Sequence, residues 1–265
     1  MALLEEGFGG GESFWRTAFG APPGKLGHGL LLETKERSAV GVMLLFENER
    51  VWAGLRRRVV NLSSWFIRPD YRAHALDMVC EVTADTGAVY TNFSPSGPVQ
   101  KLMTALGFRY AWRGSYVTVP LLNGLMAGAD VALGDSGSEH MPPELALIAG
   151  GTGVPPDRYI WVKAQVHDET AVAAFRVIYR RGCRVGRLAY CSNHAVLRRA
   201  LPSLHWHLLW RSRVVALVLP MLPAYEGLTS LRRPPYGPPT MVRGDISDGQ
   251  VDTLQSESHY LSLNN

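Results

Sequence analysis

Residues 72–77 form the segment of this chain that is best suited to binding an anion. They read Arg-Ala-His-Ala-Leu-Asp and follow an apolar and hydroxyl-rich run at residues 61–67. The first turn of a helix presents unpaired backbone N–H groups and the positive end of the helix dipole, and both attract phosphate. If a helix begins here, this turn can hold the phosphates of a ligand.

A change in hydrophobic period predicts the elements around this turn. Residues 61–67 predict a strand that stops at Pro69, because proline has no N–H for a ladder. From Tyr71 onward the apolar residues recur at helical spacing, and Gly87 is a suitable helix end. We interpret Cys80 as a small core residue on this helix. The predicted buried stripe consists of Ala75, Leu76, Val79, Cys80 and Val82.

A second strand and a second helix are predicted to follow. Residues 88–93 are too few for a stable helix and indicate a buried strand, and residues 94–97 are turn material. Pro98 suits the first helical position after a cap at Ser96 or Gly97. Gly107 then ends this helix.

The rest of the first half predicts a mostly antiparallel sheet. We expect a flexible leader, a short helix and three strands, and then a closing hairpin around Arg113 and Gly114. The fold class is therefore α/β, with a mixed sheet flanked by helices. The expected ranges are 1–11 for the leader, 12–19 for the helix, 29–33, 39–46 and 51–58 for the strands, 47–50 for a turn, and 108–112 with 115–120 for the hairpin.

The order strand, turn, helix, strand, helix resembles the acyl-CoA-binding core of the GNAT N-acyltransferase superfamily. The resemblance covers residues 27–120 and rests on Arg-Pro-Asp-Tyr-Arg-Ala-His-Ala at 68–75 and Leu-Gly-Phe-Arg at 106–109. The strand Asn-Leu-Ser-Ser-Trp-Phe also resembles a subgroup associated with polysaccharide and envelope biosynthesis. The resemblance implies acyl-CoA as co-substrate, no metal, and acyl transfer to an amine or hydroxyl of an acceptor.

The resemblance also implies roles for individual residues. Backbone N–H groups at Phe66 and Ile67 would polarise the thioester carbonyl, and Asn92 and Ser96 would line the pantetheine groove. The pyrophosphate would be bound by the turn made of Arg72, Ala73, His74, Ala75, Leu76 and Asp77.

The chain departs from the family pattern at its acid–base residues. The usual tyrosine is Met103, the two usual glycines are Ala73 and Ala75, and residues 61–67 contain no glutamate. Methionine cannot donate a proton. The local candidates for proton transfer are therefore the side chains of Ser64, Asn92 and Ser94, and water.

A second hypothesis is a non-catalytic GNAT-fold binding module that recognises an anionic partner. Residues 176–213 contain no acidic residue, and such a charge asymmetry suits an acidic acyl-carrier protein, a lipid headgroup surface or an anionic glycan. A scattered solvated surface is the alternative. The arginines are Arg176, Arg180, Arg181, Arg184, Arg187, Arg198, Arg199, Arg211 and Arg213.

The second half resembles a degenerate GNAT-like copy in its order of elements only. We expect strands at 159–165, 185–190 and 214–219 and helices at 169–180 and 195–201, without a CoA-binding turn. The expected domains are a leader (1–11), a GNAT-like acyl-CoA-binding domain (12–122), a connector (123–156), the degenerate half (157–228) and a polar tail (229–265).

Bulk composition narrows the remaining function classes. The chain has 265 residues and a formal net charge of +4, which is too small to indicate nucleic acid as a partner. Three cysteines fit no disulfide framework, and no signal region or membrane-spanning apolar run is present. We therefore expect a cytoplasmic protein. Cys191, His194, His205 and His207 have metal-compatible spacings, but no carboxylate lies nearby in sequence, and we predict no metal site.

Overall fold

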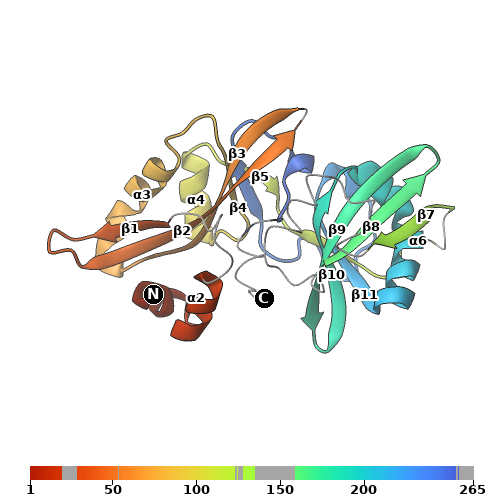
Figure 1. The fold of residues 1–265 in the computed structure, drawn as a ribbon, viewed down its shortest axis with the longest axis horizontal. Helices are drawn as coiled ribbons and strands as arrows, with labels where there is room; N and C mark the ends of the chain where they lie inside the picture. Colours follow the sequence, from red (N-terminus) through yellow and green to blue (C-terminus); the bar gives the residue numbers. More distant parts are fainter. Residues whose placement is uncertain are drawn as a thin grey trace. The chain divides into compact units, whose positions relative to one another are not determined.

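The computed structural model of the chain describes residues 1–19, 29–52, 54–122, 124, 128–134, 159–254 and 256. It contains two compact units, each built around a six-stranded mixed sheet (Figure 1). The first unit comprises Met1–Tyr110 and Thr240–Ile246, and the second comprises Ala111–Pro239 and Ser247–Leu254. The α/β fold class expected from the sequence is confirmed.

The first sheet has the strand order β1-β2-β3-β4-β12-β5. Strands β1, β2 and β3 form an antiparallel meander, β3 and β4 are parallel, and β12 is antiparallel to β4. The strands are β1 (Gly29–Glu33), β2 (Ala39–Trp52), β3 (Leu55–Ile67), β4 (Val89–Asn92), β5 (Arg109–Trp112) and β12 (Thr240–Arg243).

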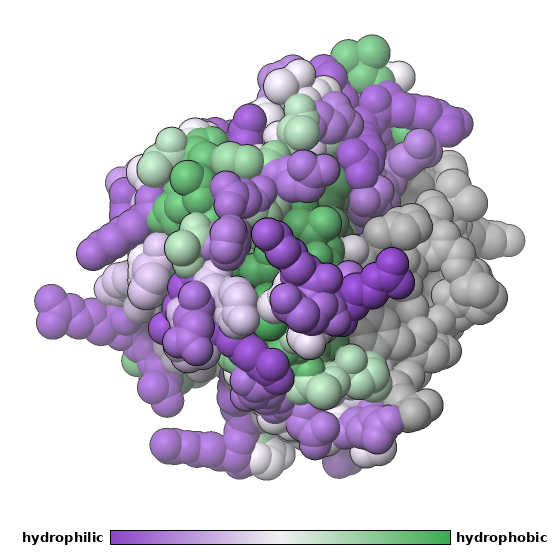
Figure 2. All heavy atoms as spheres, turned by 90° about the vertical axis from the view of Figure 1, so that its left-hand side faces the viewer, coloured by the Kyte–Doolittle hydropathy of each residue, from purple (hydrophilic) through white to green (hydrophobic). Residues whose placement is uncertain are grey.

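Helices cover both faces of this sheet. On one face, α3 (Ala75–Val82) and α4 (Gly97–Ala105) contribute Val79 and Met103 to a core that includes Leu62. On the other face, α1 (Ala2–Phe8) and α2 (Gly11–Phe19) bury apolar side chains against β2. Figure 2 shows that hydrophilic side chains cover most of one outer side of the molecule, with apolar side chains grouped between them.

Two expectations about the N-terminal unit are wrong at the level of single residues. The expected leader is not without secondary structure, because helix α1 forms within it and buries Leu3 and Leu4. Cys80 is exposed, because α3 turns Met78 and Val79 toward the sheet instead. The buried face of α3 therefore differs from the predicted one, because it includes Met78 and excludes Cys80.

The β2–β3 hairpin is longer than expected. The predicted turn at residues 47–50 lies within β2, where Glu47 forms an ion pair with Arg58 and Glu49 one with Arg56. These cross-strand pairs of opposite charge support the extended conformation of a polar sequence.

Part of the expected polar tail is a strand of the first sheet. Residues Thr240–Arg243 form β12 between β4 and β5, and Met241 is fully buried there.

The closing hairpin expected around Arg113 and Gly114 does not form, since β5 belongs to the first sheet and β6 (Ser115–Thr118) to the second.

The second sheet has the strand order β6-β11-β10-β9-β8-β7. Its parallel pair, β10 and β11, is connected by helix α6, as α3 connects β3 and β4, so the two sheets fit a tandem arrangement of two halves. Residues 123, 125–127 and 135–156 of the expected connector lie outside the described residues. The remaining elements are β7 (Asp130–Gly134), β8 (Tyr159–Val166), β9 (Glu169–Arg180), β10 (Cys183–Cys191), α6 (His194–Ser212) and β11 (Val214–Pro220).

The predicted helix at residues 169–180 is wrong, because this segment is strand β9. It pairs with β8 on one side and with β10 on the other. His167 has a positive φ of 55° in the tight turn that reverses the chain before β9. The predicted short helix at 195–201 is instead the 19-residue α6, capped by Asn193, whose Oδ1 accepts from the N–H of Val196.

The second unit is expected to lose stability in acid through His205. This side chain is 3% exposed, its Nε2 is 2.9 Å from Thr118 Oγ1, and burial lowers its pKa from 6.5 to about 4. A histidine that is buried in its neutral form stabilises the fold fully above its unfolded pKa, and this contribution is lost as the pH falls through the folded pKa. Between pH 6.5 and 4 the free energy of unfolding should fall by about 3 kcal/mol.

Urea unfolding at several pH values checks this expectation with His205→Gln, which should flatten the acid limb. His167→Gln, at an exposed turn position, is the matched control. An acid limb that is unchanged in His205→Gln would assign the effect to other groups.

Candidate functional site

Strands β3 and β4 diverge soon after they begin to pair. Their parallel register consists of Val59–Val89, Val60–Tyr90 and Asn61–Thr91. Strand β3 then continues to Ile67, whereas β4 ends at Asn92. From Leu62 onward, β3 therefore presents backbone groups that pair with β2 on one side and with no β4 residue on the other.

A β-bulge interrupts β3 in this divergent part. Ser63 pairs with Leu44 and Phe66 pairs with Val42, so that Ser64 and Trp65 both lie opposite Met43. Ser64 has a φ of 37°, which is unusual for a residue with a side chain.

The bulge changes which side chains face the helices. Leu62 and Ile67 both pack in the core with α3 and α4, although they are five positions apart and would face opposite sides of a regular strand. Phe66 instead packs against α1, with its ring centroid 6.5 Å from that of Phe8. Without the extra residue, the side chains beyond it would exchange faces. The bulge thus directs Phe66 toward α1 and Ile67 toward α3 and α4.

Buried polar groups hold the strands where they separate. Asn61 is 1% exposed, and its Nδ2 donates to the carbonyl of Thr91 at 3.2 Å. Asn92 is also buried, and its Oδ1 accepts from the N–H of Ser94 at 3.1 Å, which closes the turn after β4. Ser63 donates to Ser64 Oγ at 3.3 Å. The indole N–H of Trp65 is shielded from solvent and has no hydrogen-bond partner among the described residues.

The turn after β3 is a 3₁₀ helix, Pro69–His74, that runs directly into α3. Arg72 is exposed and makes no ion pair within the described part of the chain, whereas Arg68 is bound to Glu6 at 2.9 Å. His74 Nδ1 lies 3.2 Å from Asp77 Oδ2 on the outer surface. The side chains of the predicted turn are therefore accessible, with Ala75 half-buried beneath them.

Two backbone N–H groups in and next to this turn already have hydrogen-bond acceptors within the chain. The N–H of Ala75 donates to the carbonyl of Arg72, and the N–H of Tyr71 donates to that of Arg68. A bound phosphate would therefore depend chiefly on the guanidinium of Arg72 and on other N–H groups of the turn. Sequence reasoning did not anticipate this internal pairing.

The start of α4 closes the other side of the divergent strands. Ser96 is its exposed N-cap residue, and Met103 is fully buried in the core. Gln100 donates to the carbonyl of Pro95 at 2.8 Å and accepts from the Tyr110 hydroxyl at 3.0 Å. These bonds fix the turn between β4 and α4.

The predicted residues lie on β3, on the turn and helix that follow it, at the end of β4 and at the N-cap of α4. Sequence reasoning missed the roles of Asn61, Thr91, Trp65 and Gln100. A polar Asn61 and Thr91 within buried strands were the available signal, since buried polar groups need partners.

The histidines of the second unit have their own hydrogen bonds. His194 Nε2 donates to the carbonyl of Gly249 at 3.1 Å, so its Nδ1 accepts from the Tyr225 hydroxyl at 2.9 Å. His207 Nδ1 donates to the carbonyl of Ser203. Burial raises the pKa of the Cys191 thiol to about 12, which keeps it protonated and unreactive. No group of three or more metal-binding side chains occurs among the described residues.

Comparisons with known proteins identify the fold. The chain is similar to a GCN5-related N-acetyltransferase from Anabaena variabilis, with 15% identity, a TM-score of 0.54, and coverage of 91% of this chain and 68% of that one. It is also similar to a probable N-acyltransferase from Enterococcus faecalis, with 10% identity, a TM-score of 0.54, and coverage of 94% and 70%. A GCN5-related N-acetyltransferase from Kribbella flavida matches with 14% identity, a TM-score of 0.47, and coverage of 78% and 57%.

The likenesses to the Anabaena variabilis and Enterococcus faecalis proteins show that the chain has the GNAT fold. No family model and no curated protein matches the sequence. Among the described residues, no helix is both long and apolar enough to cross a membrane.

Proposed function

We propose that this protein transfers an acyl group from acyl-CoA to an amine or hydroxyl of an acceptor. The observation that carries the proposal is the divergence of β3 from β4 beside an exposed, arginine-bearing turn. The part of β3 beyond Asn61 pairs with no β4 residue, and such a strand edge suits an extended, amide-containing chain, which can add to it as a further strand. Pantetheine is such a chain, and the phosphates of CoA would then reach Arg72.

The reaction needs few protein groups. A lone pair of the acceptor attacks the thioester carbonyl, the carbonyl oxygen becomes an oxyanion, and the C–S bond breaks to release the CoA thiolate. Positioning of the two substrates and hydrogen bonds to the oxyanion supply most of the catalysis in such a site. Of the two N–H groups that the resemblance implies, that of Ile67 would be the donor at the open edge: the N–H of Arg68 donates to Val40 of β2, and N–H groups alternate along a strand, so that of Phe66 also faces β2. The indole N–H of Trp65 would be a second donor.

Proton transfer would use the hydroxyl at the bulge. Ser64 Oγ accepts from Ser63, so its own O–H can donate to the departing thiolate while Ser64 takes up the proton that the attacking amine or hydroxyl loses, directly or through water. Asn92 is fixed by its bond to Ser94 and would orient the pantetheine, with Ser96 at the groove entrance. Met103 is fully buried and takes no part.

The acceptor we propose is a precursor of a polysaccharide or envelope component, on the strength of the Asn-Leu-Ser-Ser-Trp-Phe strand of β3. Acyl-CoA is made and consumed in the cytoplasm, which is therefore the proposed location. The second unit would hold no CoA of its own, since no arginine-bearing 3₁₀ turn leads into a helix among its described residues.

Release of the CoA thiol from acetyl-CoA and longer acyl-CoA species tests the function. With a suitable amine or hydroxyl acceptor, the wild-type protein is expected to release thiol in proportion to enzyme concentration. Saturable CoA binding without thiol release for any acceptor class would instead support a non-catalytic GNAT-fold binding module, which the loss of the tyrosine at Met103 favours.

A further inference from the structure

One end of the second sheet combines exposed aromatic and basic side chains. The β9–β10 turn and the junction between α6 and β11 lie side by side there, because Arg184 pairs with Tyr179 on β9 and with Val214 on β11 (Figure 1). We call this surface the basic–aromatic tip. It consists of Tyr179, Arg180, Arg181, Trp210, Arg211, Arg213 and Val215.

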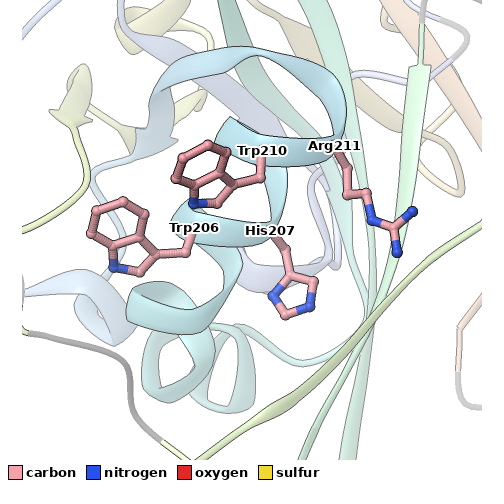
Figure 3. Close-up of a pocket in the computed structure, with 4 residues that line it drawn as sticks. All are labelled: Trp206, His207, Trp210 and Arg211. Carbon is pink, nitrogen blue, oxygen red and sulfur yellow. The ribbon is translucent and has the colours of Figure 1, made fainter.

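The aromatic side chains of the tip are unusually exposed. Trp210 is 77% exposed and Tyr179 is 70% exposed, and the aliphatic Val215 is 37% exposed. Trp206 and Trp210 lie on one side of the last turns of α6, beside His207 and Arg211, and the four side chains line an open hollow of about 410 Å³ (Figure 3). Large apolar side chains placed this way indicate a surface that contacts a partner.

The exposure begins partway along one stripe of α6. Val196, Ala200 and Ser203 follow one another at helical spacing and are buried at 0–2%. His207 continues the same stripe and is half-buried, and Trp210, one turn further on, is exposed. This stripe of α6 is buried at its start and exposed at its end, which distinguishes it from an ordinary solvated helix surface.

The tip carries four arginines that have no acidic partner among the described residues. Arg180, Arg181, Arg211 and Arg213 are exposed, and none of them makes an ion pair within the described part of the chain. No acidic residue occurs between Glu169 and Glu226. A tight turn holds the first two arginines outward, since Arg181 and Gly182 both have positive φ. The other arginines of the sequence cluster lie elsewhere: Arg199, for example, is paired with Glu169.

We propose that the basic–aromatic tip binds the surface of an anionic phospholipid bilayer. Indole and phenol rings favour the interface between headgroups and acyl chains, and arginines beside them contact lipid phosphates. Clustered basic residues are attracted to anionic lipids over about a Debye length. The contact is interfacial and needs no spanning helix. It does not depend on the proposed acyl transfer.

Co-sedimentation of the full chain with vesicles tests the proposal. The protein should pellet with vesicles of equimolar phosphatidylcholine and phosphatidylglycerol, stay largely in the supernatant with phosphatidylcholine alone, and dissociate as salt is raised. Arg180→Ala/Arg181→Ala should weaken partitioning by about 25-fold, because each basic residue near the surface contributes about a factor of five. Trp210→Ala should also weaken it, and should reduce the blue shift of tryptophan emission on binding.

The matched control is Arg232→Ala/Arg233→Ala, which removes the same charge from exposed positions outside the tip. This variant should bind vesicles nearly as well as the wild type. Equal loss in both double variants, or equal binding to neutral and anionic vesicles, would overturn the proposal. So would binding to duplex DNA with no binding to vesicles, which would assign the arginines to nucleic acid.

Discussion

Replacing Ser64 by valine is expected to abolish acyl transfer and to lower the free energy of unfolding by about 1–3 kcal/mol. Ser64 has a φ of 37°, a conformation that a β-branched residue strongly disfavours. The variant would relieve the strain by losing the bulge, and Phe66 and Ile67 would then point to the wrong faces of the sheet. Thiol release from acyl-CoA and urea unfolding measure the two effects.

Ser64→Gly separates the backbone from the hydroxyl. Glycine adopts positive φ without strain, so the bulge and CoA affinity should be retained, and stability should not fall. If the hydroxyl donates the proton, turnover should still decrease while CoA affinity stays unchanged. Full activity in Ser64→Val would contradict the role given to the bulge.

Replacing Arg72 by alanine is expected to weaken CoA binding by about 1.5–3 kcal/mol, or about 10- to 150-fold in Kd, the range of a hydrogen bond to a charged group. Arg72 is the exposed cation of the turn after β3, and it has no ion-pair partner among the described residues. Isothermal titration with CoA measures the loss. Stability should be nearly unchanged, because the side chain is exposed.

Arg56→Ala is the control for this loss of charge, since Arg56 is exposed on the β2–β3 hairpin and paired with Glu49. Its affinity for CoA should equal that of the wild type. Titration with dephospho-CoA shows which phosphate Arg72 contacts, because a contact to the 3′-phosphate would make Arg72→Ala and the wild type bind dephospho-CoA equally. Unchanged CoA affinity in Arg72→Ala would place the phosphates elsewhere.

Local signals in the sequence predicted the central elements well. Pro69 and Gly107 mark the ends of β3 and of the α4 segment, and a switch from period two to helical spacing marks α3. The turn, β4 and the cap of α4 follow from side chains that act within a few residues of their own position. Such locally determined elements can be predicted from the sequence.

The wrong predictions depend on distant partners or on ambiguous composition. In β9 the alanines at 171, 173 and 174 fit either a helix or a strand, and pairing with β8 and β10 decides the outcome. Strand β12 joins β4 across most of the chain length, which no local pattern reveals. The polar tail was misread for that reason.

The candidate site also combines features that the local sequence predicts with features that depend on distant strands. The turn residues around Arg72 could be identified from type and spacing. The bulge at Ser64 and the bond from Asn61 to Thr91 could not, because both depend on the register of neighbouring strands. The internal bond from Ala75 to the Arg72 carbonyl likewise needs the 3₁₀ geometry of the turn.

The most direct test of the central claim, that the divergent β3–β4 edge and its turn bind CoA, is isothermal titration of the wild-type protein with CoA. We predict saturable one-to-one binding with a Kd well below millimolar. The affinity for CoA should be weaker in Arg72→Ala and Ser64→Val but not in Arg56→Ala. An absence of binding by the folded wild-type protein at millimolar CoA would contradict it.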